Sequence, residues 1–231
     1  MSELTHKEFC QRFVAVFGSP GIAALGWWHA SFFRAIILEQ TGYPHLMLYG
    51  AERTRQKGIA SLLAGTQSVK FSADQVVIRM WAKCAYTGMP TVVQGKYYPS
   101  GKALMMYGGD MQEQDELVKR CLCVFTGGAD SEPLDENNEQ YKVLHQLSDK
   151  ALQQSAQMVA QYAERIRPNW YWSQYKRYYL RLSNDNKAHK VRRVTHVSLL
   201  LAANFVMLDD GYNPGYSIKQ LEDEIIPGIN Y

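Results

Sequence analysis

Apolar residues recur at helical spacing through the first third of the chain. Thr5 and Glu8 have the spacing of a capping box, in which two side chains satisfy free amides at a helix start. We expect a first helix over 6–17, because Gly18-Ser19-Pro20 then interrupts the apolar pattern. Two further helices are expected, over 22–40 and over about 45–64.

The middle of the chain has patterns typical of strands. Residues 66–71 alternate apolar and polar side chains and lead into a helix that begins near Ser72. Residues 91–98 and 102–107 flank a Pro-Ser-Gly turn, which predicts a β-hairpin. The segment 111–125 predicts another helix.

Residues 127–133 are acidic and rich in helix breakers, so they are the best linker candidate. Beyond them the pattern predicts only helices: one over 138–167, one with Pro168 at its first position, one over 187–208 and one over 217–225. The expected fold is mainly α with a small β element (α+β). It divides into an N-terminal helical region, 1–128, with the strand-helix unit and the hairpin, and a C-terminal helical region, 134–231.

A chain of 231 residues with 46% hydrophobic content can bury a substantial core. No run of 18 uncharged apolar residues occurs, and the N-terminus MSELTHKEF lacks the basic-then-apolar order of a signal peptide. We therefore expect a soluble, cytoplasmic protein that does not associate with a membrane.

The four cysteines indicate no disulfide framework, because thiols stay reduced in a cytosolic protein. Cys84, Cys121 and Cys123 supply three zinc-type ligands with no fourth ligand at motif spacing. A structural zinc ion at these three thiols is the alternative. We interpret the cysteines, Cys10 included, as buried small apolar residues and expect neither a metal nor another cofactor.

Local signatures of catalysis are missing from the sequence. It contains no phosphate-loop signature, GxGxxG, HExxH or GxSxG motif. Asp209 and Asp210 form a pair that could bind a metal or act as acid and base, although acids followed by Gly211 are also typical of an exposed helix end. His196 lies within an apolar run and is expected in the interior. We expect a protein that is not an enzyme, with action on nucleic acid through the aspartate pair as a third alternative.

Charge is concentrated in residues 165–193, which hold nine Lys or Arg and one Asp. This segment carries +8 and the rest of the chain −5, out of a total of +3. Basic side chains neutralise phosphates, and aromatic rings between them can stack on bases. The segment therefore favours a nucleic-acid partner.

On a helix over 169–182 the side chains of Trp172, Tyr175, Tyr179 and Leu182 share one side and are expected to face the core. At the start of the next helix, basic residues oppose the helix dipole, and a bound anion would offset that cost. The candidate phosphate contacts of these two helices are Lys176, Arg177, Arg181, Lys187, Lys190, Arg192 and Arg193.

The strand at 66–71 is a second candidate surface. If Val69 and Phe71 face the core, Ser68 and Lys70 project from the other side with Thr66 at the strand start, in position to read base edges as β-ribbon proteins do. Basic residues on the exposed side of the expected third helix extend this surface: Arg53, Arg55 and Lys57.

The stretch GIAALGWWHASFFRAIILEQTGYPHLMLYGAERTR, with VKFSADQVV farther on, resembles AcaB-like transcriptional regulators of plasmids and other conjugative elements. The shared features are a Gly-Ile opening, Arg-Ala-Ile in an apolar helix, a later proline and a Val-x-Phe-Ser strand. The resemblance implies a ribbon-helix-helix-like core, activation of transfer genes and a dimer, with Ser68 and Lys70 facing DNA and Val69 and Phe71 structural. The chain departs from this pattern after Gly88. Either a hairpin is inserted there and 111–125 supplies the second helix, or the resemblance is accidental.

These patterns together predict a non-catalytic, DNA-binding transcriptional regulator that acts as a homodimer on double-stranded DNA. The alternative is a helical adaptor subunit of a multiprotein complex, because aromatic residues and arginine are equally enriched where proteins bind one another.

Overall fold

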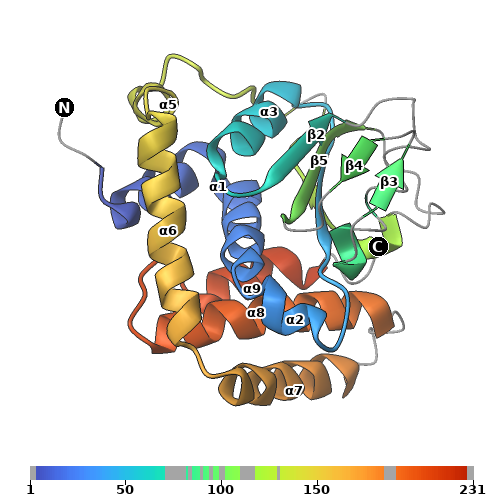
Figure 1. Cartoon of the computed structure of the whole chain (residues 1–231). Helices are drawn as coiled ribbons and strands as arrows, with labels where there is room; N and C mark the ends of the chain where they lie inside the picture. The colour runs from blue at the N-terminus through green and yellow to red at the C-terminus, as the bar shows by residue number, and fades with distance from the viewer. Residues whose placement is uncertain are drawn as a thin grey trace.

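The computed structural model describes residues 4–70, 82, 85–88, 91–93, 96–98, 102–109, 118–128, 131–184 and 191–227. Within these residues the protein is mainly helical, with a small parallel sheet on one side of the helices (Figure 1). The predicted α+β class is confirmed at this level.

The long first helix, α1 (His6–Ser31), is bent where the sequence predicts an interruption. Thr5 and Glu8 form the predicted capping box, and Gly18 has non-helical dihedral angles (φ 59°, ψ −143°) that a glycine adopts without strain. Pro20 follows as an early residue of the second half. A short helix, α2 (Arg34–Leu38), ends the segment expected to be helical to residue 40.

Four parallel strands form the main sheet in the order β2-β5-β1-β6. Their bounds are β1 His45–Tyr49, β2 Gln67–Lys70, β5 Leu104–Gly109 and β6 Cys121–Phe125. The helix α3 (Arg53–Leu62) connects β1 to β2, and a 3-10 turn, η1 (Val118–Arg120), precedes β6. The strands β3 (Thr91–Val93) and β4 (Lys96–Tyr98) form a separate antiparallel pair.

Two predicted helices were wrong because their apolar runs are strands. Residues 45–49 form β1 rather than the start of a helix, and residues 121–125 form β6. The predicted hairpin was also wrong in its pairing, since β4 pairs with β3 while β5 pairs in parallel with β1 and β2. Strands buried on both faces lack the apolar-polar alternation that identifies an exposed strand.

Successive side chains of these strands pack on opposite faces of the sheet, in two different hydrophobic clusters. Leu46 and Leu48 of β1 belong to the main core with the helices. Met47, between them, packs on the opposite face with Ala82 and Ala85. Cys121 lies on that same second face, so its burial follows from the two-residue period of a strand.

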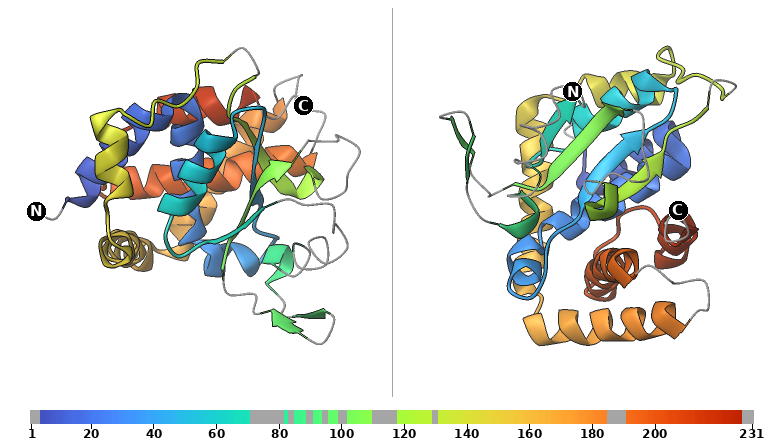
Figure 2. Two further views of the ribbon diagram at one scale, coloured as in Figure 1. Left: turned by 90° about the horizontal axis from the view of Figure 1, so that it is seen from above. Right: turned by 90° about the vertical axis from the view of Figure 1, so that its right-hand side faces the viewer.

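The C-terminal helices form layers over the other face of the sheet (Figures 1 and 2). The single helix predicted over 138–167 is two helices, because the chain breaks at residues 146–148 and Ser148 caps the second. Pro168 begins the next helix as predicted, and Ser217 caps the last. The bounds are α5 Glu139–His145, α6 Asp149–Arg165, α7 Pro168–Asn184, α8 Val191–Asp209 and α9 Ile218–Ile225.

The helix α8 lies between α7 and the rest of the molecule, and contacts α1, α9 and β6. Val194, Leu200 and Met207 are fully or almost fully buried. One core cluster contains residues from both sides of the expected linker, among them Phe13 and Leu200.

The ribbon-helix-helix part of the expected fold is not confirmed. In such a ribbon, residues 67–70 would pair antiparallel with the same strand of a second chain. Here β2 pairs in parallel with β5 of its own chain, Ser68 opposite Met105. Most of the helix expected after Ser72 lies outside the described residues. Among the described helices, none has the length and apolar character needed to cross a membrane.

Candidate functional site

The helix α7 is the outermost element on its side of the molecule and packs on α8 (Figures 1 and 2). Three of its residues, Tyr171, Tyr178 and Leu182, are at most 5% exposed and anchor it to the core. Tyr171 stacks on Phe33, with ring centroids 5.6 Å apart. These contacts hold the rest of the helix at the surface.

The inner face of α7 differs from the predicted one. Leu182 is buried as expected, but Trp172, Tyr175 and Tyr179 are only half-buried. These three rings form an edge-packed row, with centroids 5.4 Å apart between Trp172 and Tyr175 and 5.8 Å between Tyr175 and Tyr179. A helix rich in aromatic residues has more than one apolar face. The face that packs against the core contains Tyr171, Tyr178 and Leu182, and it differs from the predicted one. Part of each of the Trp172, Tyr175 and Tyr179 rings is therefore accessible.

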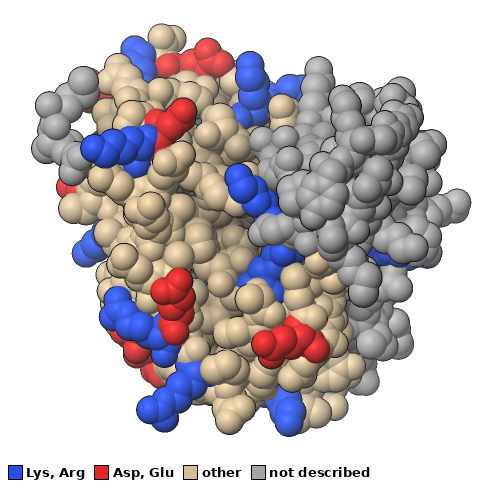
Figure 3. All heavy atoms as spheres, in the orientation of Figure 1, with Lys and Arg blue, Asp and Glu red and all other residues tan. Residues whose placement is uncertain are grey.

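Basic side chains line the exposed side of α7. Lys176, Arg177 and Arg181 are exposed, as are Arg165 and Arg167 just before the helix. No Asp or Glu occurs between residues 165 and 184. Figure 3 shows Lys and Arg side chains along the lower edge of the molecule, where Figure 1 places α7.

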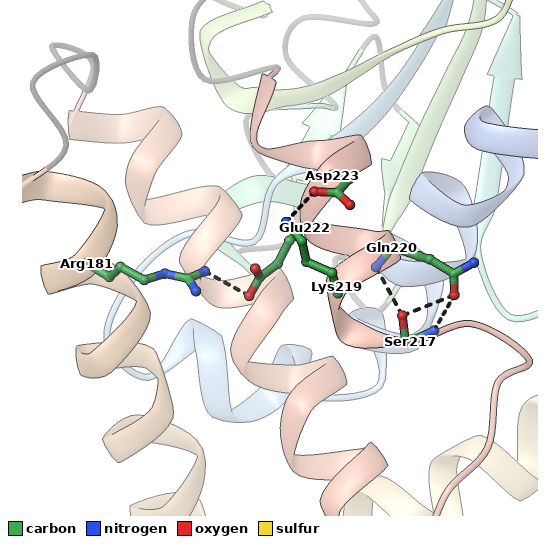
Figure 4. Close-up of polar contacts among 6 residues, drawn as sticks. All are labelled: Arg181, Ser217, Lys219, Gln220, Glu222 and Asp223. Atoms are coloured by element: carbon green, nitrogen blue, oxygen red, sulfur yellow. Dashed lines mark hydrogen bonds and ion pairs between the residues drawn. The ribbon is translucent and has the colours of Figure 1, made fainter.

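Some of these cations already have partners. Arg181 Nη2 lies 2.8 Å from a carboxylate oxygen of Glu222 in α9 (Figure 4), and its guanidinium lies 4.9 Å from the centre of the Tyr178 ring. Arg177 lies over Phe205 at 5.7 Å. In the part of the chain that the structure describes, Arg167 and Lys176 form no ion pair, so they are the most available for an anion.

At the start of α8 the structure describes one of the four predicted basic side chains, that of Arg193. Lys187 and Lys190 lie outside the described residues, as does the side chain of Arg192. Arg193 is half-buried, and its Nη1 atom is enclosed. Burial raises the pKa of the Cys123 thiol to about 11, and the charge of Arg193 acts in the opposite direction.

The structure describes only part of the second predicted surface. Thr66 is half-buried and donates its hydroxyl to the Leu63 carbonyl at 2.7 Å, while Ser68 and Lys70 lie in the edge strand β2 and their side chains are outside the described set. Arg53 and Lys57 are exposed on α3. Arg55 instead donates to the Thr126 carbonyl at 2.8 Å and to the Glu132 carbonyl at 3.2 Å, so it connects α3 to the segment after β6.

The other residues singled out in the sequence fall in ordinary positions. His196 is 1% exposed, as predicted, with its Nε2 3.1 Å from the Tyr86 hydroxyl. Asp209 and Asp210 are exposed at the end of α8, before Gly211 with a φ of 90°. Cys10 and Cys121 are buried thiols, and Cys84 lies outside the described residues.

A buried polar cluster joins both ends of the chain and was not predicted. His6 and Cys10 come from the first turns of α1, His29 from its end, and Tyr212 and Tyr216 from the connection between α8 and α9. Among the described residues, His6, Cys10 and His29 are the group whose donor atoms lie within 4.8 Å of one another. The four-residue spacing of His6 and Cys10 is the only local sign of the cluster in the sequence.

The hydrogen bonds of this cluster fit one continuous chain. Tyr216 donates to Asn204 Oδ1 at 2.8 Å, so its oxygen accepts from His29 Nδ1 at 2.7 Å. Nε2 of His29 is then an acceptor, and the Tyr212 hydroxyl donates to it at 2.7 Å.

The hydrogen bonds continue from Tyr212 to His6 and Ser155. Because the Tyr212 hydrogen is used by His29, its oxygen accepts from His6 Nε2, and His6 Nδ1 accepts from the Ser155 hydroxyl. Burial lowers the pKa of His6 to about 4. Burial, with the neighbouring His6, lowers the pKa of His29 well below its usual value. Both rings are therefore neutral, as this chain of hydrogen bonds requires.

Two imidazoles and a thiol at this distance could hold a zinc ion. However, the Tyr212 hydroxyl bonds both Nε2 atoms that would be the ligands, and the second nitrogen of each ring also has a partner. Every ring nitrogen of the two histidines is satisfied without a metal. We interpret the cluster as a buried hydrogen-bond network that ties α1 to the C-terminal helices.

Comparisons with protein-family models, with curated proteins and with solved structures gave no match to this chain.

Proposed function

We propose that the protein is a non-catalytic DNA-binding protein whose exposed face of α7 contacts the phosphate backbone. The proposal rests on the charge of this surface helix. Five exposed cations lie in it or just before it, and no Asp or Glu occurs between residues 165 and 184. Lysine and arginine gain affinity for DNA by releasing condensed counterions. The half-exposed rings of Trp172, Tyr175 and Tyr179 add flat surfaces beside those cations.

Transcriptional regulation is the role we propose for this binding, following the resemblance to regulators of conjugative elements. In that role the protein is a homodimer, and Ser68 and Lys70 read bases. Such a ribbon requires two copies to pair through the edge of β2 that β5 does not occupy, since β2 ends the sheet order. The α7 surface supplies auxiliary phosphate contacts.

The test compares charge removal on α7 with equal charge removal elsewhere. Arg167→Gln with Lys176→Gln removes the two most available cations, one just before α7 and one within it. Lys142→Gln with Lys150→Gln, two exposed lysines of α5 and α6, is the matched control. Binding to labelled duplex is measured by fluorescence anisotropy over a range of salt concentrations. The α7 variant should bind more weakly, and its salt slope should fall by about 2, because each phosphate contact contributes about 0.9 to the slope.

The control pair should retain the wild-type slope. Equal weakening in both double variants would refute α7 as the interface and leave only a general charge effect. Lys70→Ala tests the ribbon separately, because loss of a base reader removes sequence preference while the salt slope stays nearly constant. Gel filtration gives the mass of the complex that binds.

A specific observation favours an adaptor as the second candidate. Leu180 is 60% exposed on α7, beside Arg181 and Tyr179, and large exposed apolar side chains near aromatic residues and arginine are typical of protein interfaces. No measurable duplex binding at low salt would remove the DNA proposal and leave the adaptor.

A further inference from the structure

The strand β6 lies at one edge of the parallel sheet, since the strand order ends with it. The Thr126 amide donates to the Tyr49 carbonyl at 2.9 Å, which fixes the direction of the main-chain groups along β6. Successive residues of a strand direct their N–H and C=O groups to opposite sides in the plane of the sheet. Val124 therefore faces β1, whereas Cys123 and Phe125 direct their N–H and C=O groups away from it.

These four main-chain groups have no hydrogen-bond partner within the part of the chain that the structure describes. Natural proteins commonly protect such an edge with a charged residue or a proline in the strand. The strand β6, with the sequence CLCVF, contains neither. Its free edge is therefore a template on which another strand can pair.

A groove with a volume of about 480 Å³ runs along this edge. The strand β6 contributes residues 122–125, α1 contributes Pro20 and Ala23 beside its bend, and α9 contributes Glu224 and Ile225. The volume is within the range of about 300–1,000 Å³ that is typical of ligand sites. Because four consecutive residues of the edge strand line the groove, an extended chain that enters it lies along β6.

Both sides of the groove offer apolar contacts. Ala23 and Ile225 belong to the main core cluster, on the same face of the sheet as Val124. On the other face the Phe125 side chain is 53% exposed, and its ring packs against Tyr49 with centroids 5.4 Å apart. The side chains of an added strand point alternately to these two faces, so apolar side chains find partners on both.

The acids of α9 indicate the charge of the ligand. Glu222 pairs with Arg181 and Asp223 pairs with Lys219 (Figure 4). Glu224, which lines the groove, forms no ion pair with any residue that the structure describes, and no described Lys or Arg lines the groove. A basic side chain on the ligand would complement this carboxylate.

We propose that the groove along β6 binds an extended peptide segment of another protein, which adds to the sheet as a further strand and carries a basic residue beside Glu224 between apolar side chains. Cys123 and Phe125 supply the main-chain hydrogen bonds. A second copy of this chain, paired through its own β6, would instead bring a second Glu224 to the interface without a cation from the groove. The proposal does not depend on DNA binding, since no described residue that lines the groove belongs to α7 or β2.

The test begins with a random heptapeptide library on phage, selected against the full chain. The enriched sequences should alternate apolar residues and contain Lys or Arg. One enriched peptide is synthesised with a fluorescent label, together with two versions that carry N-methyl groups on alternate amides. Fluorescence anisotropy should show binding at least tenfold weaker for the version whose methyl groups replace the N–H groups that face β6. The other version is the matched control, because its methylated amides point away from β6, and it should bind about as tightly as the parent peptide.

Charge reversal tests the role of Glu224. Glu224→Lys should weaken binding of the labelled peptide at least fivefold, because it replaces an attraction by a repulsion. Glu164→Lys, at an exposed position of α6, makes the same change of charge and should keep the wild-type affinity. Circular dichroism reports whether both variants fold.

Amide hydrogen exchange of the wild type adds a measurement that needs no variant. The peptide should slow exchange of the Cys123 and Phe125 amides. The Leu122 and Val124 amides face β1 in the sheet, so their exchange should change little.

Several outcomes would overturn the proposal. These are a selection that enriches no peptide, equal weakening by the two N-methylated versions, and equal affinity of the two charge variants. Slow exchange of the Cys123 and Phe125 amides before any peptide is added would show that the edge is already occupied. A mass in gel filtration that falls when the peptide is added would identify a second copy of the chain as the occupant.

Discussion

The side-chain oxygen of Gln56 accepts a hydrogen bond from the Gly108 amide at 2.8 Å, which joins the helix after β1 to the end of β5. The side-chain nitrogen of Gln56 donates to the Gly50 carbonyl and to the Thr126 hydroxyl, so one buried side chain satisfies groups at the ends of three strands. Such a residue stabilises the sheet chiefly because its loss leaves buried polar atoms without partners.

Gln56→Leu should therefore destabilise the protein strongly. Each buried group left without a hydrogen bond costs about 1–3 kcal/mol, so we expect a loss of about 3–5 kcal/mol in the free energy of unfolding. Urea unfolding monitored by fluorescence measures this change. Gln153→Leu, at an exposed position of α6, is the control and should change stability by less than about 0.5 kcal/mol. Equal effects at both positions would contradict the assigned role of Gln56.

Tyr212→Phe should interrupt the buried hydrogen bonds that connect His6 to His29. The substitution keeps the ring but removes the hydroxyl that bonds both Nε2 atoms, at a cost of about 1–3 kcal/mol. Tyr162→Phe is the matched control, because the Tyr162 ring packs against Tyr212 with centroids 5.2 Å apart and is only half-buried. Similar melting temperatures for the two variants would argue against the network.

Stability should fall as the pH is lowered below about 6.5, the ordinary pKa of histidine. The folded pKa values of His6 and His45 are about 4, and that of His29 is also depressed, so the unfolded chain binds protons first. Between about pH 6.5 and 4, each such histidine costs up to about 1.4 kcal/mol per pH unit. Urea midpoints at pH 7.5 and 5.5 measure the loss. The control variant His145→Gln, at an exposed position, should lose nearly as much stability between these pH values as the wild type does. A wild-type stability that does not change with pH would exclude buried neutral histidines.

Glu222→Gln should strengthen DNA binding while stability changes little. The substitution releases Arg181, whose side chain is 50% exposed and ion-paired at 2.8 Å, and removes a carboxylate that repels phosphate. The Glu222 side chain is 13% exposed, so the pair is only partly exposed, but glutamine keeps an oxygen that can accept from Arg181, and we expect a loss of about 1 kcal/mol at most. Glu136→Gln, an exposed acid before α5, removes the same charge away from α7. Anisotropy titrations should show tighter binding only for Glu222→Gln, and no difference between the two would weigh against α7 as the interface.

Part of this fold could be predicted because its signals are local. The capping box at Thr5, the start of α7 at Pro168 and the cap at Ser217 each depend on groups within three residues along the chain. The strands β1 and β6 could not be distinguished from helices, because a short apolar run fits either structure. Pairing with neighbouring strands in the sheet decides that these residues form strands. The face of α7 that lies against α8 was likewise ambiguous in a helix where aromatic residues occur on several sides.

By itself, the sequence determined the mainly helical class, the helix starts at Thr5, Pro168 and Ser217, and the position of the basic segment after residue 165. The tertiary structure alone decided which residues meet. His6 and Tyr212 are 206 positions apart, and Gln56 and Thr126 are 70 apart. Contacts over such separations arise when buried polar groups find partners during packing, and no spacing along the chain encodes that choice.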